Sequence, residues 1–457
     1  MHPFASYVLR TYYKATGWNE DNLFTNLTRS SDGTSYLVFK ISPETEVVLA
    51  ILDFTVPNGI HLSMSKSPNS LFKTTYSMNA IPSLNGSVGY IFTSCDLDIK
   101  SSGHVPFKNM IERFKVYDRP RRPEGKGEEW LAGERVDTRD YLMYGRLYIP
   151  TGRLDALYST RLSPTLQAVV AAISDPLGKV RPDIRGRGGD MSNLMVYLQH
   201  DVGKWCTEYS WSAEDSMWGI KVLHNFGRLG GTTPTDTEAN SHATTSPKVK
   251  VKRIDEEDAI EGGLKGRVCA GAEVYFSAKE RSAGISTGVR FTTIPDATPP
   301  SYQIPPPSTS ALSAVSVSKN PPSQSPTTIT ALFNPMLGHL SGAYSARVSD
   351  DLSLSSRFDF NVYSYESEWT MGAEYWLRRN SSLEGSTDTQ TEPEQGGKKP
   401  IHGVVKARAS TSNDVSIMWE GRIRNMLVSL GVVSDFSSRL KPIKSMGLEL
   451  SYFSSDN

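Results

Sequence analysis

Apolar and polar residues alternate at every second position along most of this chain. Successive side chains of a β-strand point to opposite faces of a sheet, so this period of two predicts half-buried strands. Counting all such segments after Leu52 gives about nineteen strands of ~8–12 residues, and no helical segments alternate with them. The clearest examples are residues 60–64, 88–93, 141–149, 194–199, 268–276, 340–348, 358–362 and 415–420.

The strand series predicts an all-β fold that closes on itself. About nineteen strands exceed what an open twisted sheet usually sustains, and closure removes the exposed edges. The longest apolar run, residues 47–52, is too short for a membrane helix, which needs ~20 residues. A membrane barrel has equally low hydropathy, because half of each strand faces a polar lumen. We therefore predict a transmembrane β-barrel, and a soluble all-β binding protein is the other possibility that the pattern leaves open.

The N-terminal residues follow a different pattern. Residues 3–16 predict a short helix with Phe4 and Val8 on one side, which Gly17 would end. Residues 18–28 are polar, with turn-forming side chains, and are interpreted as a connector. The helix and this connector together form the first region, residues 1–28. Residues 29–51 form an atypical insertion with apolar runs but no consistent period, and residues 52–457 form the barrel.

Long polar insertions separate some of the predicted strands, whereas short turns separate the others. The insertions are rich in Ser, Thr, Pro, Gly and charged residues, and they comprise residues 96–137, 229–262, 295–326 and 380–400. Such segments bury too little apolar surface to offset the entropy of ordering, so we predict largely disordered loops. None of them divides the strand series into separate cores, which indicates one domain.

Composition and charge exclude several function classes. Lys plus Arg and Asp plus Glu are both 49, so no overall field favours nucleic acid or an acidic substrate. The three cysteines have no paired spacing, and the eight histidines have no metal-ligand spacing. The glycine-rich stretches 185–189 and 227–231 do not open a helix as phosphate-binding loops do, so they are interpreted as turns. We predict neither an enzyme nor a cofactor.

The last strand-like stretch, residues 445–452, has a second property besides its alternation. Met446, Leu448, Leu450 and Tyr452 share one face, and Ser445, Gly447, Glu449 and Ser451 share the other. The stretch also resembles the β-signal of mitochondrial outer-membrane barrels, which directs the precursor to the sorting and assembly machinery and becomes the closing strand. Ser445, Gly447, Leu450 and Tyr452 occupy the fixed positions of that signal.

Short sequence stretches along the whole chain resemble those of the family of the fungal mitochondrial distribution and morphology protein 10. The matching stretches run in order from one end to the other: residues 7–13, 16–19, 52–54, 86–90, 144–148, 161–164, 222–226, 271–273, 334–339, 344–346, 358–364, 372–376 and 419–421. The resemblance implies a nineteen-stranded barrel with parallel first and last strands and an N-terminal helix associated with the pore. Residues 31–51 depart from the family, as a genuine insertion or as an error in the gene model.

The resemblance also implies a place and partners. The place is the mitochondrial outer membrane at contact sites with the endoplasmic reticulum. One set of partners is the lipid-transfer and tether subunits of the ER–mitochondria encounter structure, and the other is the subunits of the sorting and assembly machinery, where this family promotes late assembly of the general import channel. The alternative function is a solute channel resembling the voltage-dependent anion channel. An anion channel favours a cationic lumen, and the balanced charge of this chain gives no such bias, although Arg146 and Arg347 are predicted to face inward.

Aromatic pairs spaced i, i+2 are the candidate partner contacts. Tyr90 with Phe92, and Phe358 with Phe360, each place two rings on one face of a predicted strand. Such rings could face lipid alone. The functional hypothesis is that one pair presents an apolar patch on the outer wall to a partner subunit.

Overall fold

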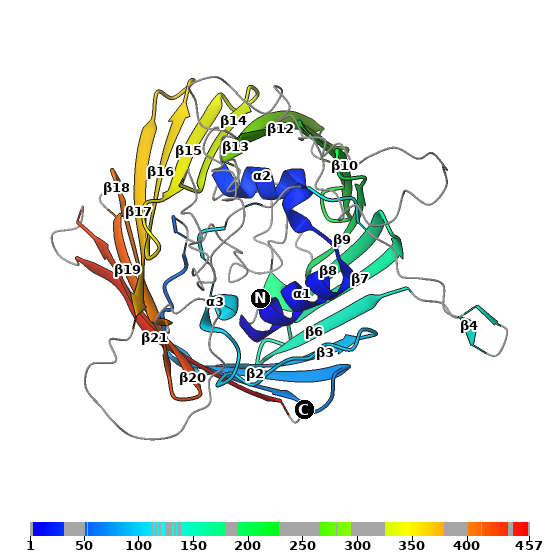
Figure 1. Ribbon diagram of the computed structural model, residues 1–457, viewed down its shortest axis with the longest axis vertical. Coiled ribbons are helices and arrows are strands. Elements are labelled where there is room, and N and C mark those ends of the chain that lie inside the picture. Colours follow the sequence, from blue (N-terminus) through cyan, green and yellow to red (C-terminus); the bar gives the residue numbers. More distant parts are fainter. Residues whose placement is uncertain are drawn as a thin grey trace, which may run out of the picture.

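A closed ring of strands surrounds the N-terminal helices (Figure 1). The computed structural model describes residues 3–31, 51–52, 54–111, 113–115, 117, 120–123, 130–131, 134–135, 139–179, 190–227, 266–279, 281–293, 325–378, 401–412, 414–436 and 442–455. Nineteen strands form one sheet, which confirms the predicted all-β barrel.

The barrel strands are nine to fourteen residues long in most cases, enough for a tilted strand to cross a membrane. They are β1 (Gly59–Ser67), β2 (Phe72–Ile81), β3 (Asn85–Thr93), β6 (Tyr141–Ile149), β7 (Leu154–Ser163), β8 (Leu166–Lys179), β9 (Asp190–Asp201), β10 (Trp205–Ser212), β11 (Met217–Asn225), β12 (Gly266–Ser277), β13 (Ser282–Thr293), β14 (Thr327–Asn334), β15 (His339–Arg347), β16 (Leu352–Asn361), β17 (Ser367–Arg378), β18 (Ile401–Ser410), β19 (Asp414–Ile423), β20 (Met426–Asp435) and β21 (Ile443–Ser455). A separate two-stranded hairpin comprises β4 (Trp130–Leu131) and β5 (Glu134–Arg135).

Each barrel strand pairs antiparallel with the next along the chain, and the ring closes through one parallel pair, β1 with β21. Because neighbours alternate in direction, the connections after β3, β11, β13 and β17 leave at the same rim. These connections carry the four long predicted insertions. Three of them lie outside the described residues, except for residues 325–326.

The predicted alternation separates lumen from outer wall. On β6, for example, Leu142 and Tyr144 are buried toward the lumen, whereas Met143 and Leu147 are exposed outside. Large apolar side chains are exposed around the ring from β1 to β21, which is the surface that a lipid bilayer requires. Arg146 is buried on the inner wall, as predicted.

The N-terminal region contains more helix than predicted. Helix α1 (Pro3–Thr16) matches the prediction and ends in a Schellman motif at Gly17, whose φ is +69°. The predicted polar connector instead forms a 3₁₀ turn, η1 (Glu20–Asn22), and helix α2 (Phe24–Ser31). A helix this short is marginal in isolation, so its packing on the barrel wall, described below, has to stabilise it. Of the atypical insertion, residues 32–50 lie outside the described residues.

Candidate functional site: the closing seam and the packed lumen

The closing seam is the parallel pairing of β1 with β21, and it contains the predicted β-signal. Gly447 lies opposite Gly59, Leu450 opposite Leu62, and Tyr452 opposite Met64. The four β-signal positions divide between the two faces of the wall, because odd-numbered residues of β21 face the lumen and even-numbered ones face outward. Their role as a recognition signal stays a prediction.

Two glycines allow the chain to enter the seam. Gly59 has a φ of +77°, and a Cβ there would overlap the carbonyl group of Ile81. A Cβ on Gly447 would lie only 2.6 Å from the carbonyl carbon of Pro57 and 2.7 Å from the carbonyl oxygen of Gly59. The seam therefore requires glycine at both of these opposed positions.

A connector, residues 51–52 and 54–57, runs along the inner wall from β17 to the seam. Its path follows three inward-facing glycines, each of which contacts it in turn: Gly372 on β17 at Ile51 and Leu52, Gly431 on β20 at Val56, and Gly447 on β21 at Pro57. Between them, Arg408 on β18 donates from Nη1 to the carbonyl oxygen of Leu52 at 3.0 Å. The absence of side chains on the glycines lets this backbone lie close to the sheet.

The lumen segment, residues 95–111, holds the end of the closing strand. The backbone N–H and the Oγ of Ser102 both donate to the carbonyl oxygen of Phe453, each at 3.0 Å. The Phe453 ring is 2% exposed and packs against Phe4 and Tyr7 of α1, with centroid distances of 5.1 and 6.0 Å. The last strand is thus bound from inside by two segments distant from it in sequence.

The prediction of a disordered loop over residues 96–137 is wrong for its first part. Leu97, Ile99 and Val105 are almost fully buried, and residues 107–110 form the one-turn helix α3 (Phe107–Met110). The ring of Phe107 packs edge-on against Trp376, 6.4 Å away between centroids. Trp376 therefore faces the lumen, although aromatic residues near strand ends are expected at a membrane interface.

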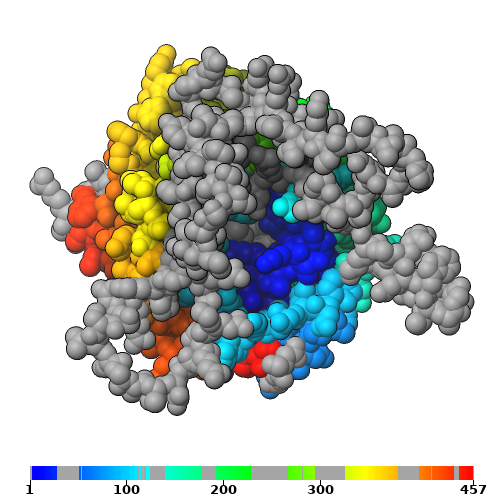
Figure 2. Space-filling view, in the orientation of Figure 1, coloured from blue at the N-terminus to red at the C-terminus, as the bar shows by residue number. Residues whose placement is uncertain are grey.

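Helix α2 packs on another part of the inner wall, formed by β10, β11, β12 and β14. Its apolar residues Phe24 and Leu27, with Leu23, contact a cluster from four strands: Cys206, Leu223, Cys269 and Leu332. Glycines again allow the close approach, because a Cβ on Gly271 would overlap the Phe24 ring and one on Gly288 would overlap Leu27. Figure 2 shows part of the N-terminal region, in blue, inside the ring of strands.

Buried polar groups fix α2 in this position. Thr25 donates to Glu208 from its backbone N–H at 3.0 Å and from its hydroxyl at 2.6 Å. Lys221 donates to the Thr25 hydroxyl at 3.2 Å and forms an ion pair with Glu273 at the same distance. Asn22 donates to Asp201 at 3.0 Å. These buried charges are paired, as burial requires.

Helix α1 contributes two tyrosines whose hydroxyl groups stay neutral. Burial is the main cause that raises the pKa of Tyr12 above its ordinary value, and it also raises the pKa of Tyr7. The apolar side of α1, which includes Phe4 and Val8, packs on inner-wall residues of β3 and β6–β9. The lumen is therefore lined by packed protein along much of its wall.

The structure places both predicted partner-contact pairs on the outer wall. Tyr90 is 52% exposed on β3, with Phe92 beside it, and Phe358 is 48% exposed on β16. The rings of Phe358 and Phe360 are parallel within 8°, 6.5 Å apart. The two pairs lie on separate parts of the ring and do not form one patch (Figure 1). Their contact with a partner stays a prediction.

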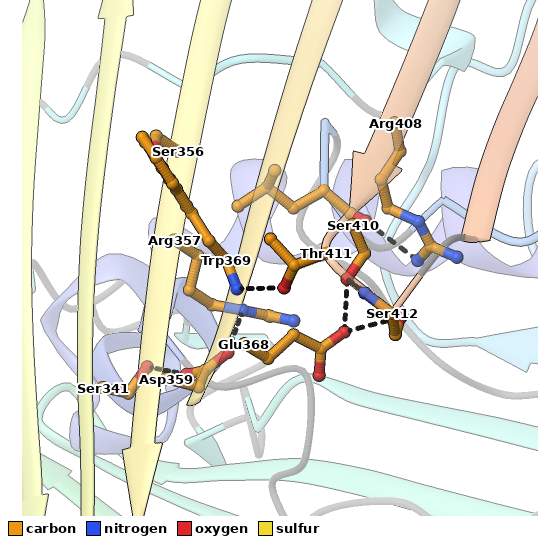
Figure 3. Close-up of polar contacts among 11 residues, drawn as sticks. Ser341, Ser356, Arg357, Asp359, Glu368, Trp369, Arg408, Ser410, Thr411 and Ser412 are labelled. Carbon is orange, nitrogen blue, oxygen red and sulfur yellow. Dashed lines mark hydrogen bonds and ion pairs between the residues drawn. The ribbon is translucent and has the colours of Figure 1, made fainter. Parts of the chain in front are cut away.

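Several polar side chains on the strands beside the Phe358 pair bond to one another (Figure 3). On the outside, the Trp369 indole donates to the hydroxyl of Ser356 at 2.7 Å. Toward the lumen, Arg357 pairs with Asp359 at 2.9 Å. The Phe358 and Phe360 rings thus stand on a wall whose neighbouring polar groups are internally bonded.

Within the described ranges, no group of three or more His, Cys, Asp and Glu side chains is arranged to hold a metal ion. No helix in that part of the chain is long and apolar enough to cross a membrane.

Sequence comparisons agree with this architecture. The chain matches the family described as mitochondrial distribution and morphology protein 10 over residues 1–402 and 393–455. A protein of that name from Laccaria bicolor is 70% identical over all of both chains. Those from Cryptococcus neoformans var. neoformans and Phaeosphaeria nodorum are 37% and 34% identical, each over 99% of this chain and 99% and 100% of their own. The chain therefore belongs to this family of mitochondrial distribution and morphology proteins.

Proposed function

We propose that this barrel is a membrane-embedded scaffold of the mitochondrial outer membrane that binds two sets of partners. One set is the lipid-transfer and tether subunits at contact sites with the endoplasmic reticulum. The other is the sorting and assembly machinery, in which the barrel promotes late assembly of the general import channel. The family resemblance supplies these partners, and membership of a family that acts in mitochondrial distribution and morphology supports them.

The packed lumen is the observation that favours a scaffold function over a channel function. Helices α1 and α2, the connector and the lumen segment all pack on the inner wall through buried apolar clusters. A wide aqueous pore would leave those apolar side chains in water, which costs free energy in proportion to their area. The outer wall and the rims are then the surfaces through which this protein acts.

The Phe358 pair supplies the direct test. Both residues are replaced by Ala in the tagged full-length chain, and partner recovery from mitochondria in mild detergent is compared with that of the wild type. The matched control replaces Val274 and Phe276, an exposed i, i+2 pair on β12, with Ala. We expect the Phe358 pair variant, but not the control, to lose one set of partners while remaining inserted. Unchanged recovery from an inserted Phe358 pair variant would show that these rings face lipid only.

A further inference from the structure

A buried arginine on the inner wall has most of its hydrogen-bonding capacity unused. Arg290 lies on β13 and is 0% exposed. Its Nη2 donates to the backbone oxygen of Asp21 at 2.9 Å, and its guanidinium lies 4.2 Å from the centroid of the Tyr117 ring. Neither Nε nor Nη1 has a hydrogen-bond partner among the residues that the structure describes. A buried cation in this state is costly unless an anion or polar ligand completes its shell.

Two hydroxyl groups beside Arg290 are also buried without a hydrogen-bond partner among the described residues. Thr330 lies directly opposite Arg290 on β14, and Thr292 lies two residues further along β13, on the same inner face. Both are at least 96% buried, with exposed fractions of 3% and 4%. Within the same described part of the chain, their Oγ1 atoms have no hydrogen-bond partner either. Three adjacent side chains therefore present unused donors to one region of the lumen.

The one carboxylate of a residue that contacts Arg290 in the described structure is engaged elsewhere. Arg290 contacts the backbone oxygen of Asp21, and the carboxylate of Asp21 pairs with Lys115. A further cation adds to the positive field, because Arg267 on β12 lies opposite Thr292 and within electrostatic range of Arg290. The donors around Arg290 thus lie in a locally positive environment, although the chain as a whole has 49 basic and 49 acidic residues.

We propose that this donor cluster, Arg290, Thr292 and Thr330, binds an oxyanion of the phosphate class inside the barrel. Guanidinium and hydroxyl donors are the groups that recognise phosphate oxygens in proteins. The phosphate group comes from either of two sources, a phospholipid head group or free phosphate. The site lies close to the rim that carries the long insertions, because Arg290 and Thr292 are near the end of β13 from which residues 294–326 leave.

Binding to the full-length chain in a non-ionic detergent and phosphate-free buffer tests the proposal. Inorganic phosphate and a short-chain phosphatidic acid below its micelle concentration are titrated separately, against chloride at equal ionic strength, by calorimetry. The variants are Arg290→Gln and Thr330→Val. The second keeps the side-chain volume and removes a hydroxyl that has no hydrogen-bond partner in the described ranges, so it should fold as well as the wild type. The control is Arg146→Gln, since that buried inner-wall arginine donates to Ser87 and Ser77.

We expect the wild type to bind the probe saturably. The affinity should be at least about tenfold weaker in Arg290→Gln and about tenfold weaker in Thr330→Val. These factors follow from the typical strength of a charge-assisted hydrogen bond. Arg146→Gln should bind as the wild type does. Binding of phosphatidic acid alone assigns the site to a lipid head group, and binding of inorganic phosphate assigns it to the free ion. No saturable binding of either probe, or equal binding by the wild type and both site variants, would overturn the proposal and leave water as the partner of these donors.

Discussion

Replacing Gly447 with Ala should weaken the closing seam more than any ordinary strand substitution. The new Cβ would lie 2.6 Å from the Pro57 carbonyl carbon and 2.7 Å from the Gly59 carbonyl oxygen, where ordinary contact begins at 3.4 Å. The Pro57 carbonyl oxygen would lie closer still, so the connector or β1 must move by roughly 1 Å, and because all these neighbours are backbone atoms, no side chain can rotate away. We expect the strain to cost about 1–3 kcal/mol, near the upper end of that range.

Part of this cost is offset in the unfolded state. Alanine restricts the unfolded chain and stabilises a strand that accepts it by about 0.4–1 kcal/mol. The net loss of about 2 kcal/mol corresponds to a factor of about 30 in the ratio of folded to unfolded protein. Urea unfolding in detergent micelles, followed by tryptophan fluorescence, measures this loss as a lower midpoint.

Gly145→Ala and Gly342→Ala are the matched controls. Both glycines lie within barrel strands, and a Cβ at either position meets no atom within 4 Å. Their unfolding midpoints should stay unchanged or rise slightly. If Gly447→Ala unfolds at the same urea concentration as these controls, the connector does not pack against the seam and the reasoning is refuted.

Further substitutions test the contacts inside the lumen. Ser102→Ala removes the hydroxyl that donates to the carbonyl oxygens of Phe453 and Asn425 and accepts from the Phe453 N–H, and it keeps only the backbone hydrogen bond between Ser102 and Phe453. The loss should cost at least about 1 kcal/mol, seen as faster amide hydrogen exchange at the end of β21; unaltered exchange there would contradict the contact. Gly271→Ala would crowd the Phe24 ring and should displace α2, so protease should cut the N-terminal region faster than in the Gly145→Ala control. An equal cleavage rate in both variants would show that α2 does not depend on this close approach.

The wall of the barrel could be predicted from sequence because its signal is local. The alternation in residues 141–149 directly gives the buried Leu142 and the exposed Met143, since side-chain direction in a strand has a period of two. The same property places Gly447 in the lumen and Tyr452 outside. Parallel closure, in contrast, came only from the family resemblance.

The contents of the lumen could not be predicted, because they depend on residues far apart in the chain. Gly372 gives no sign in the sequence that Ile51 lies against it, and Ser102 gives none that it binds Phe453. One signal was present and missed: Cys95, Leu97 and Ile99 alternate with charged residues and are all buried. An extended segment inside a polar insertion can therefore pack on a wall without belonging to the sheet.

The central claim is that this barrel binds both the contact-site tether and the assembly machinery. The direct measurement is purification of the tagged full-length chain from mitochondria in mild detergent, with identification of every bound protein. The proposed function predicts recovery of the lipid-transfer and tether subunits together with the subunits of the sorting and assembly machinery. Recovery of neither set, from a protein that resists carbonate extraction, would contradict the claim and favour a solute channel.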